Sequence, residues 1–262
     1  MLQKFIIACC LCLTLCPIHK AAGQYPHVGV DGDIPLGTLD EMENMLDVAD
    51  AHQKANLLTR LGVDPVIAKC AVDELLPGER IELKSIRVPG EADYGVLFLH
   101  SGMGVCGYLY LLQGSDQDPK KTPWHAIDHQ ETNCWNGPYS YEIMPLRRSD
   151  GDDIVLHHVN YDHGSNILIN QTQVFSILGG KLVQTLATQD YHSEEILGTG
   201  EENTLEQSST FLRFPNNSLE ETRASTYNDK LKKVERRYWR WSEQKRKFVP
   251  GPFRLIVAPS LY

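Results

Sequence analysis

The chain lacks the features that mark several large classes of protein. It has 262 residues, of which 42% are hydrophobic and 23% charged, and its 20 glycines and 14 prolines follow no period. This composition excludes a collagen-like chain, a coiled coil and a disordered polar tail. Positive charge is also in deficit, since 25 Lys and Arg face 34 Asp and Glu. That balance argues against a surface built to neutralise phosphates, so no nucleic-acid partner is expected.

No uninterrupted apolar run reaches the ~20 residues that a membrane-spanning helix needs. The N-terminal run Phe5–Cys16 is shorter, follows Lys4 and precedes a segment ending in Ala21-Ala22-Gly23. These three regions match a secretory signal peptide, so we predict that residues 1–23 are removed and that the protein is secreted or periplasmic, without a membrane span. Lipidation of Cys16 is the alternative, although the bulky Leu15 stands where a small residue is usual.

Cysteine is scarce once the signal peptide is removed. Of the seven cysteines, Cys70, Cys106 and Cys134 remain. No Cys-x-x-Cys pair is left, which excludes a thioredoxin-like site and a four-thiolate zinc site. An odd number in an oxidising compartment permits at most one intramolecular disulfide. Of the three pairings, we favour Cys106–Cys134, because both lie near ends of predicted strands whereas Cys70 lies on a predicted helix.

Hydrophobic periodicity divides the mature chain into three parts. Residues 24–37 show no periodicity and are rich in Gly, Pro and Asp, so we expect an exposed arm. Over residues 38–78 apolar positions recur every three or four residues, which predicts a helical hairpin that begins with a capping box at Thr38 and Glu41. From residue 79 to 262 the period is close to two, which predicts an antiparallel β domain.

The β domain is expected to be a meander of strands joined by tight turns. So many strands exceed what one twisted open sheet comfortably holds, so a sandwich, a barrel-like sheet or a propeller-like sheet is expected. The predicted strands are Arg80–Val88, Tyr94–His100, Val105–Leu112, Trp124–His129, Ser140–Leu146, Ile154–Tyr161, Ile167–Ile177, Leu182–Thr188, Thr210–Phe214, Thr222–Tyr227, Leu231–Trp241 and Phe253–Val257.

Two glycine-rich motifs fit a turn better than a catalytic site. Residues 102–107 have the spacing G-x-G-x-x-G, but the predicted strand that follows stands where a dinucleotide-binding site needs a helix. Ser101 lacks the preceding glycine of a nucleophile elbow, because Leu99 occupies that position. Both motifs therefore predict a hairpin turn.

Metal and acid motifs are equally incomplete. His125 and His129 would suit zinc only on a helix, and Ala126 then stands where a zincin has its catalytic Glu. The acidic run at residues 150–153 does not continue into the spacing of a calcium loop. Glu194 and its neighbour Glu195 would point to opposite faces of a strand. We therefore predict no metal, no cofactor and no catalytic residue.

The most unusual segment is basic and aromatic. Residues 230–247 contain nine Lys and Arg against two Glu, a local charge of +7. On a strand, Arg236, Tyr238 and Arg240 share one face. Guanidinium groups alternating with an aromatic ring suit an anionic glycan, an envelope polymer or an acidic protein, through charge-assisted hydrogen bonds and stacking. These three residues are the predicted ligand-binding site.

The alternative for this segment is purely structural. In that case Trp239 and Trp241 pack in the core, while the charged groups face water or neighbouring acidic strands. The sequence identifies no family and contains no complete catalytic constellation. We therefore expect an exported, mainly β protein with a non-enzymatic binding or cell-envelope role. A secreted hydrolase acting on glycans, with acids or histidines brought together by folding, is the alternative.

We predict that the exported protein contains a Cys106–Cys134 disulfide. Closing this loop is expected to stabilise the fold by ~3–4 kcal/mol, mainly by restricting the unfolded chain. Peptide mapping without reduction should find the two residues in one cross-linked species and Cys70 alkylated. Three alkylated cysteines, or a cross-link through Cys70, would contradict the prediction.

Overall fold

The computed structural model describes most of the chain after residue 37. The described residues are 38–73, 75, 81–88, 93–100, 107–114, 124–132, 139–147, 151–162, 167–196, 203–214, 218–228 and 230–257. The predicted signal peptide, the predicted arm, Cys106 and Cys134 lie outside these ranges, and Cys70 lies within them. All described residues belong to one compact unit, Ile34–Tyr262.

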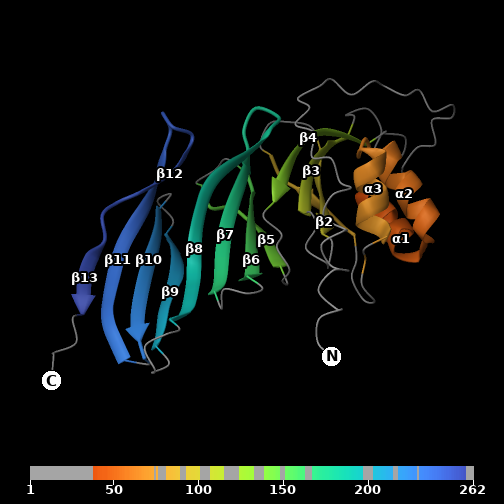
Figure 1. The fold of residues 1–262 in the computed structure, drawn as a ribbon. Helices are drawn as coiled ribbons and strands as arrows, with labels where there is room; N and C mark the ends of the chain where they lie inside the picture. Colours follow the sequence, from red (N-terminus) through yellow and green to blue (C-terminus); the bar gives the residue numbers. More distant parts are fainter. Residues whose placement is uncertain are drawn as a thin grey trace, which may run out of the picture. The chain divides into compact units, whose positions relative to one another are not determined.

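The described unit is mainly β, with short helices at its start (Figure 1). Its helices are α1 (Leu39–Val48), α2 (Ala51–Arg60) and α3 (Pro65–Asp73), and its strands are β1 (Glu82–Ile86), β2 (Tyr94–His100), β3 (Gly107–Gln113), β4 (His125–Thr132), β5 (Tyr139–Met144), β6 (Asp153–Asp162), β7 (Ile167–Ile177), β8 (Leu182–Ile196), β9 (Asn203–Phe214), β10 (Ser218–Tyr227), β11 (Lys230–Ser242), β12 (Lys247–Pro250) and β13 (Arg254–Val257).

The helical segment differs from the predicted hairpin because it contains three helices. The capping box of Thr38 and Glu41 is present at the start of α1, as the sequence predicted. A second capping box, of Asp50 and Gln53, starts α2, because the backbone at Ala49 and Asp50 is extended. Each side chain of that box caps the other residue's backbone N–H, which satisfies donors that a continuous helix would have bonded internally. The predicted two-helix hairpin is therefore wrong.

The helices are held close to the smaller sheet. Gly62 ends α2 in a left-handed conformation with φ of +94°, and a Cβ atom there would lie 3.3 Å from the Cβ atom of Ala126. The backbone N–H of Ala126 donates to the carbonyl oxygen of Leu61 at 2.6 Å. At the other end of the helical layer, the side chain of Leu39 packs on Gly95, where an added Cβ atom would lie 3.0 Å from it. These contacts place α1 and α2 over β2 and β4.

The smaller sheet has the order β1-β2-β3-β4, and its central strands β2 and β3 are buried on both faces. Leu97, Leu99 and Tyr110 belong to the cluster that includes the helices, whereas Val96 and Phe98 belong to a second cluster on the other face. Strands that are buried on both sides need no polar alternation. This explains why β2 and β3 are nearly continuous apolar runs.

The second face of this sheet packs on the start of the larger sheet. Phe98 stacks on Tyr141 of β5 with ring centroids 3.9 Å apart, and both lie beside the buried Ile154. The side chain of Asp128 accepts a hydrogen bond of 2.7 Å from the backbone N–H of Leu182. Apolar burial and polar contacts therefore join the two sheets of the described unit.

The larger sheet is antiparallel and open. Its strands follow the order β12-β11-β10-β9-β8-β7-β6-β5, and β13 also pairs with β11. The expectation of an antiparallel meander is therefore confirmed. A closed barrel and a ring of propeller blades are wrong for the described strands, because neither sheet closes and the strands form one short and one long meander.

The larger sheet also curls, so that its last strands pack across the face of its first ones. One face of β6 and β7 contacts the four-stranded sheet. The opposite face of the same two strands contacts side chains of β10, β11 and β12. The members of this second contact, which we call the seam, are Val155, Val174, Leu186, Leu219, Trp239 and Phe248, with Leu146 beside them.

Several strands are longer than their apolar pattern indicates. β9 begins at Asn203 rather than Thr210, and β8 continues to Ile196 rather than Thr188. Both extensions are polar and are held by backbone pairing between β8 and β9. β12 was not predicted, and it follows a turn in which Arg246 has a positive φ of 49°. Backbone hydrogen bonding needs no apolar alternation, so the sequence pattern underestimates such strands.

Within the described residues, no helix combines the length and hydropathy that crossing a membrane requires.

A buried ion pair lies beside the seam. The Nε atom of Arg147 donates to Asp153 at 3.0 Å, and both side chains are almost fully buried. Asp153 also accepts hydrogen bonds from Ser176 at 2.6 Å and from the backbone of Leu146 at 3.1 Å, while the guanidinium lies over the ring of Trp241. Burial raises the pKa of Asp153 above its ordinary 3.8, against the opposing effect of Arg147 and the hydrogen bonds.

We predict that Arg147→Met destabilises the protein in a pH-dependent way. A carboxyl group with a raised folded-state pKa contributes most to stability below its ordinary pKa, and that contribution is lost as the pH rises through the raised value. Without Arg147 the pKa of Asp153 rises further. The loss should therefore reach ~3–5 kcal/mol at pH 8 and be smaller at pH 5, as measured by urea unfolding.

The matched control is Arg87→Met. Arg87 pairs with Asp152, the neighbour of Asp153, at 3.3 Å, but its side chain is 68% exposed. Exposed pairs contribute less than about 1 kcal/mol, so this variant should resemble the parent at both pH values. Equal losses for Arg147→Met at pH 5 and pH 8 would contradict the predicted titration of Asp153.

Candidate anion-binding face

The basic segment forms β11, which is paired along both of its edges. β10 lies on one side in antiparallel register, and β12 and β13 share the other side. Its central residues alternate in exposure: Tyr238 and Arg240 are exposed, whereas Trp239 between them is buried. The alternation separates an inner face, which includes Trp239, from an outer face, which includes Tyr238.

The inner face of β11 belongs to the core. Trp239 is part of the seam, and Trp241 contacts Phe248 edge-on with ring centroids 5.4 Å apart. Arg147 lies 5.1 Å from the centre of the Trp241 ring. The two tryptophans thus have the structural role that the alternative interpretation of this segment gave them.

A fully buried carboxylate organises the charges of the inner face. Glu221 of β10 has a solvent-exposed side-chain fraction of 0% and accepts hydrogen bonds from Arg237 at 2.5 Å, Trp239 at 2.7 Å and Arg223 at 2.9 Å. Two guanidinium groups and an indole N–H thus satisfy one carboxylate. A buried carboxylate needs such partners because removing its hydration is costly.

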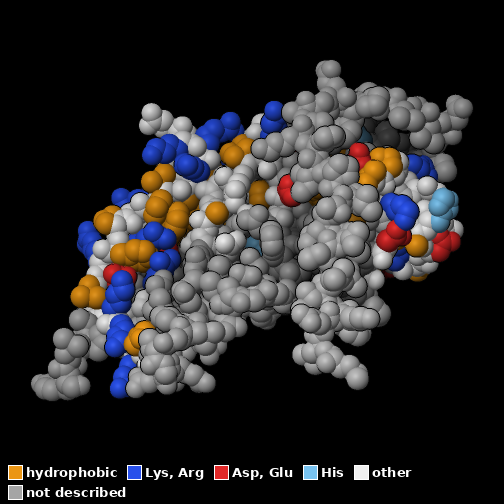
Figure 2. Space-filling model, in the orientation of Figure 1, with side chains coloured by type: hydrophobic (Ala, Val, Ile, Leu, Met, Phe, Trp, Pro, Cys, Tyr) orange, Lys and Arg blue, Asp and Glu red, His pale blue; other side chains and the backbone are white. Residues whose placement is uncertain are grey.

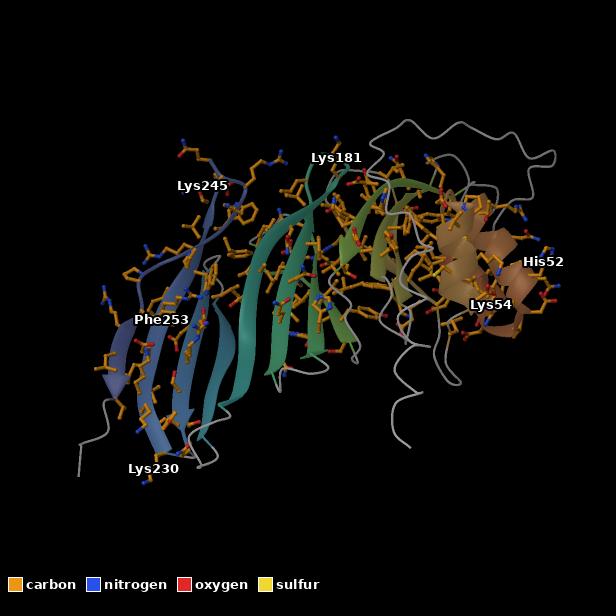
Figure 3. All side chains as sticks on the ribbon, viewed as in Figure 1. His52, Lys54, Lys181, Lys230, Lys245 and Phe253 are labelled. Carbon is orange, nitrogen blue, oxygen red and sulfur yellow. The ribbon has the colours of Figure 1, made fainter. Side chains whose placement is uncertain are left out.

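Phe253 covers this network from the link between β12 and β13. Its ring centre lies 4.2 Å from the guanidinium carbon of Arg237 and 4.9 Å from that of Arg223. Just before it, the N–H of Gly251 donates to the carbonyl oxygen of Tyr238 at 2.7 Å. Figure 3 shows Phe253 beside β11, at the start of β13. These contacts anchor the last described strand to β11.

The outer face carries the predicted ligand-binding residues. Arg236, Tyr238 and Arg240 lie opposite Thr222, Glu220 and Ser218 of β10, respectively. The Nε atom of Arg236 is 3.1 Å from the carboxylate of the buried Glu220, so one of the two arginines already has a counter-charge. Arg240 is exposed, and 42% of the surface of Tyr238 is accessible to solvent.

The tertiary structure adds a residue that the sequence analysis missed. Arg254 of β13 is directly opposite Arg236 of β11, so both side chains project from the same face, and Arg254 is exposed. Like charges directly opposite one another in a sheet are unfavourable. We call Arg236, Tyr238, Arg240 and Arg254 the outer basic face. The sequence predicted the strand that contains Arg254 but held no signal for its pairing with β11.

Further cations surround this face. Figure 2 shows Lys and Arg side chains interleaved with hydrophobic ones over the C-terminal strands. In the sequence, residues 230–257 contain ten Lys and Arg against two Glu. Figure 3 shows Lys230 and Lys245 at opposite ends of β11. The end of the larger sheet is therefore strongly cationic.

The structure also places the motifs that the sequence analysis set aside. His125 and His129 lie on strand β4 rather than on a helix. Ser101 and the glycine-rich motif lie outside the described residues except for Gly107, which begins β3. Asp152 pairs with Arg87 while Asp153 pairs with Arg147, so these neighbouring acids diverge. Among the residues described, no three His, Cys, Asp or Glu side chains lie together in a way that could hold a metal ion.

Comparisons of the chain with protein-family models, with curated proteins and with solved structures give no match. Function is therefore inferred from the geometry and charge of β11 and its neighbours.

We predict that Glu221→Gln destabilises the fold strongly. The substitution keeps the shape but leaves Arg223 and Arg237 without their counter-charge, which should cost roughly 3 kcal/mol in urea unfolding followed by tryptophan fluorescence. The control is Glu235→Gln, because Glu235 pairs with Lys233 at 2.9 Å near the surface. It should cost less than about 1 kcal/mol. Similar losses for the two variants would show that the buried network is not a special source of stability.

Proposed function

We propose that the protein binds an anionic ligand through the outer basic face and that it acts by binding rather than by catalysis. The observation that carries this proposal is the pair of arginines, Arg236 and Arg254, on adjacent strands of one face. Glu220 compensates Arg236, but the exposed Arg240 and Arg254 make no ion pair with any described residue. Bound anions would relieve the repulsion between neighbouring guanidinium groups.

The aromatic ring of Tyr238 supports a ligand with some apolar surface. It lies between Arg236 and Arg240 along the strand and is partly exposed. A ring flanked by guanidinium groups can stack on a sugar or contact an aliphatic side chain while the cations bind carboxylate or phosphate groups. An anionic glycan, an envelope polymer and an acidic protein all meet this description.

Hydrolysis has less support from the described residues. A glycosidase needs two carboxylates across a cleft, one held protonated and one ionised. Here the buried carboxylates are engaged by arginine: Asp153 by Arg147, Glu220 by Arg236, and Glu221 by Arg237 and Arg223. These carboxylates form structural ion pairs with arginines instead of facing each other across a cleft, which favours a binding role over hydrolysis. Secretion of the mature protein remains part of the proposal.

We predict that Arg240→Ala combined with Arg254→Ala weakens binding to polygalacturonate and to polyglutamate by about tenfold at low salt. The loss should shrink as salt rises, because exposed charges are screened over ~8 Å at physiological ionic strength. Fluorescence anisotropy at several salt concentrations measures both effects. Arg236 is left unchanged because its removal would strand the buried Glu220.

The matched control replaces Lys54 and Lys181 by alanine. Figure 3 shows Lys54 on the helices and Lys181 beside the turn between β7 and β8, both away from β11. This variant has the same net charge as the first and should bind like the parent. The melting temperature of each variant should stay close to the parental value, since exposed substitutions change stability by less than ~0.5 kcal/mol and the half-buried Lys54 makes no ion pair with a described residue. Equal weakening by the two variants would refute a localised binding face.

A further inference from the structure

The strand β13 is a short strand of four residues at the edge of the larger sheet. It pairs with β11 through one edge, and no other described strand pairs with it. Leu255, Ile256 and Val257 are exposed, with accessible fractions of 59%, 45% and 46%. Edge strands are normally blunted by Lys, Pro or a covering element, because their free N–H and C=O groups accept further strands. Here three consecutive apolar residues occupy the edge.

This edge is held in place rather than frayed. Phe253, immediately before β13, packs on the guanidinium groups of Arg237 and Arg223. β13 pairs with β11 at Arg254, Leu255 and Val257, and a register irregularity leaves Ile256 without an opposite residue. A partner would therefore meet a preformed strand and lose little affinity to the cost of ordering it.

Charge identifies the kind of chain that would pair with this edge. β13 belongs to a segment with ten Lys and Arg against two Glu, residues 230–257. Two copies of this protein joined through β13 would bring two such segments together, and the repulsion opposes that arrangement. An extended segment rich in Asp and Glu would place its carboxylates near Arg254 and Arg236, while apolar side chains at its alternate positions cover Leu255 on the opposite face.

We propose that β13 accepts an extended acidic segment of a partner protein as an additional antiparallel or parallel strand. The inference deepens the proposed function and rests on it, because the outer basic face supplies the electrostatic attraction. Main-chain hydrogen bonds along the edge supply the binding mode, and alternate apolar side chains of the segment supply specificity for a polypeptide over other anions.

The test compares two probes with one variant. The probes are a fluorescein-labelled octapeptide that alternates Glu with Val, and labelled octaglutamate. The variant is Leu255→Lys combined with Ile256→Lys, which raises the positive charge while giving the edge the protection that natural edges have. Simple charge attraction predicts that both probes bind this variant more tightly. Strand addition predicts about tenfold weaker binding of the alternating peptide and tighter binding of octaglutamate.

A second measurement needs no variant. N-methylation of every second residue of the alternating peptide removes the N–H groups from one edge but keeps its charge. The wild-type protein should bind the methylated peptide about tenfold more weakly. Unchanged binding of the methylated peptide, or tighter binding of the alternating peptide to the lysine variant, overturns strand addition and leaves the anion-binding function standing. Failure of the wild-type protein to bind either probe overturns both proposals.

Sedimentation velocity tests whether a second copy of this protein, rather than a partner segment, occupies the edge of β13. The wild-type protein should sediment as a monomer without the peptide. A dimer that the lysine variant converts to a monomer would show that a second copy occupies β13, which overturns the proposal.

Discussion

The packing of Trp239 and Phe248 against Val155 and Val174 is the contact on which the arrangement of the larger sheet depends. This seam brings the last strands of a long open meander across the face of its first strands. Apolar burial of this kind is the main favourable contribution to folding, and here it acts between parts of one sheet. The side chain of Trp239 packs in this seam. Because successive side chains of a strand point to opposite faces, those of its neighbours Tyr238 and Arg240 are exposed.

The seam also divides the charged groups into two kinds. The buried carboxylates are neutralised within the fold, as Glu221 is by Arg237 and Asp153 by Arg147. On the outer face and at β13 the cations exceed the acids that contact them. Unbalanced cations are tolerated where water solvates them, and such places are available to an anionic partner. One face of β11 therefore belongs to the core, and the opposite face is the proposed binding face.

The sequence predicted some elements closely because their causes are local. The capping box at Thr38 depends on residues three positions apart, and the faces of β11 depend on alternation within one strand. The break before α2 was also local, but the box formed by Asp50 and Gln53 was overlooked inside a longer apolar stripe. The polar strand β9 had no such signal, because backbone pairing with its neighbours holds it.

Three features follow from the amino-acid sequence alone: the antiparallel β character, the presence of N-terminal helices, and the position of Arg236, Tyr238 and Arg240 on one face of a strand. Each of these follows from periodicity along a few neighbouring residues. Three other features depend on the complete fold: the larger sheet curls without closing, Glu221 is the centre of a buried ionic network, and Arg254 joins the outer basic face at the edge of the sheet. Those features depend on which strands, distant in the sequence, become neighbours in the fold. Side-chain packing between these strands stabilises that arrangement, and local periodicity in the sequence does not show which strands will pack together.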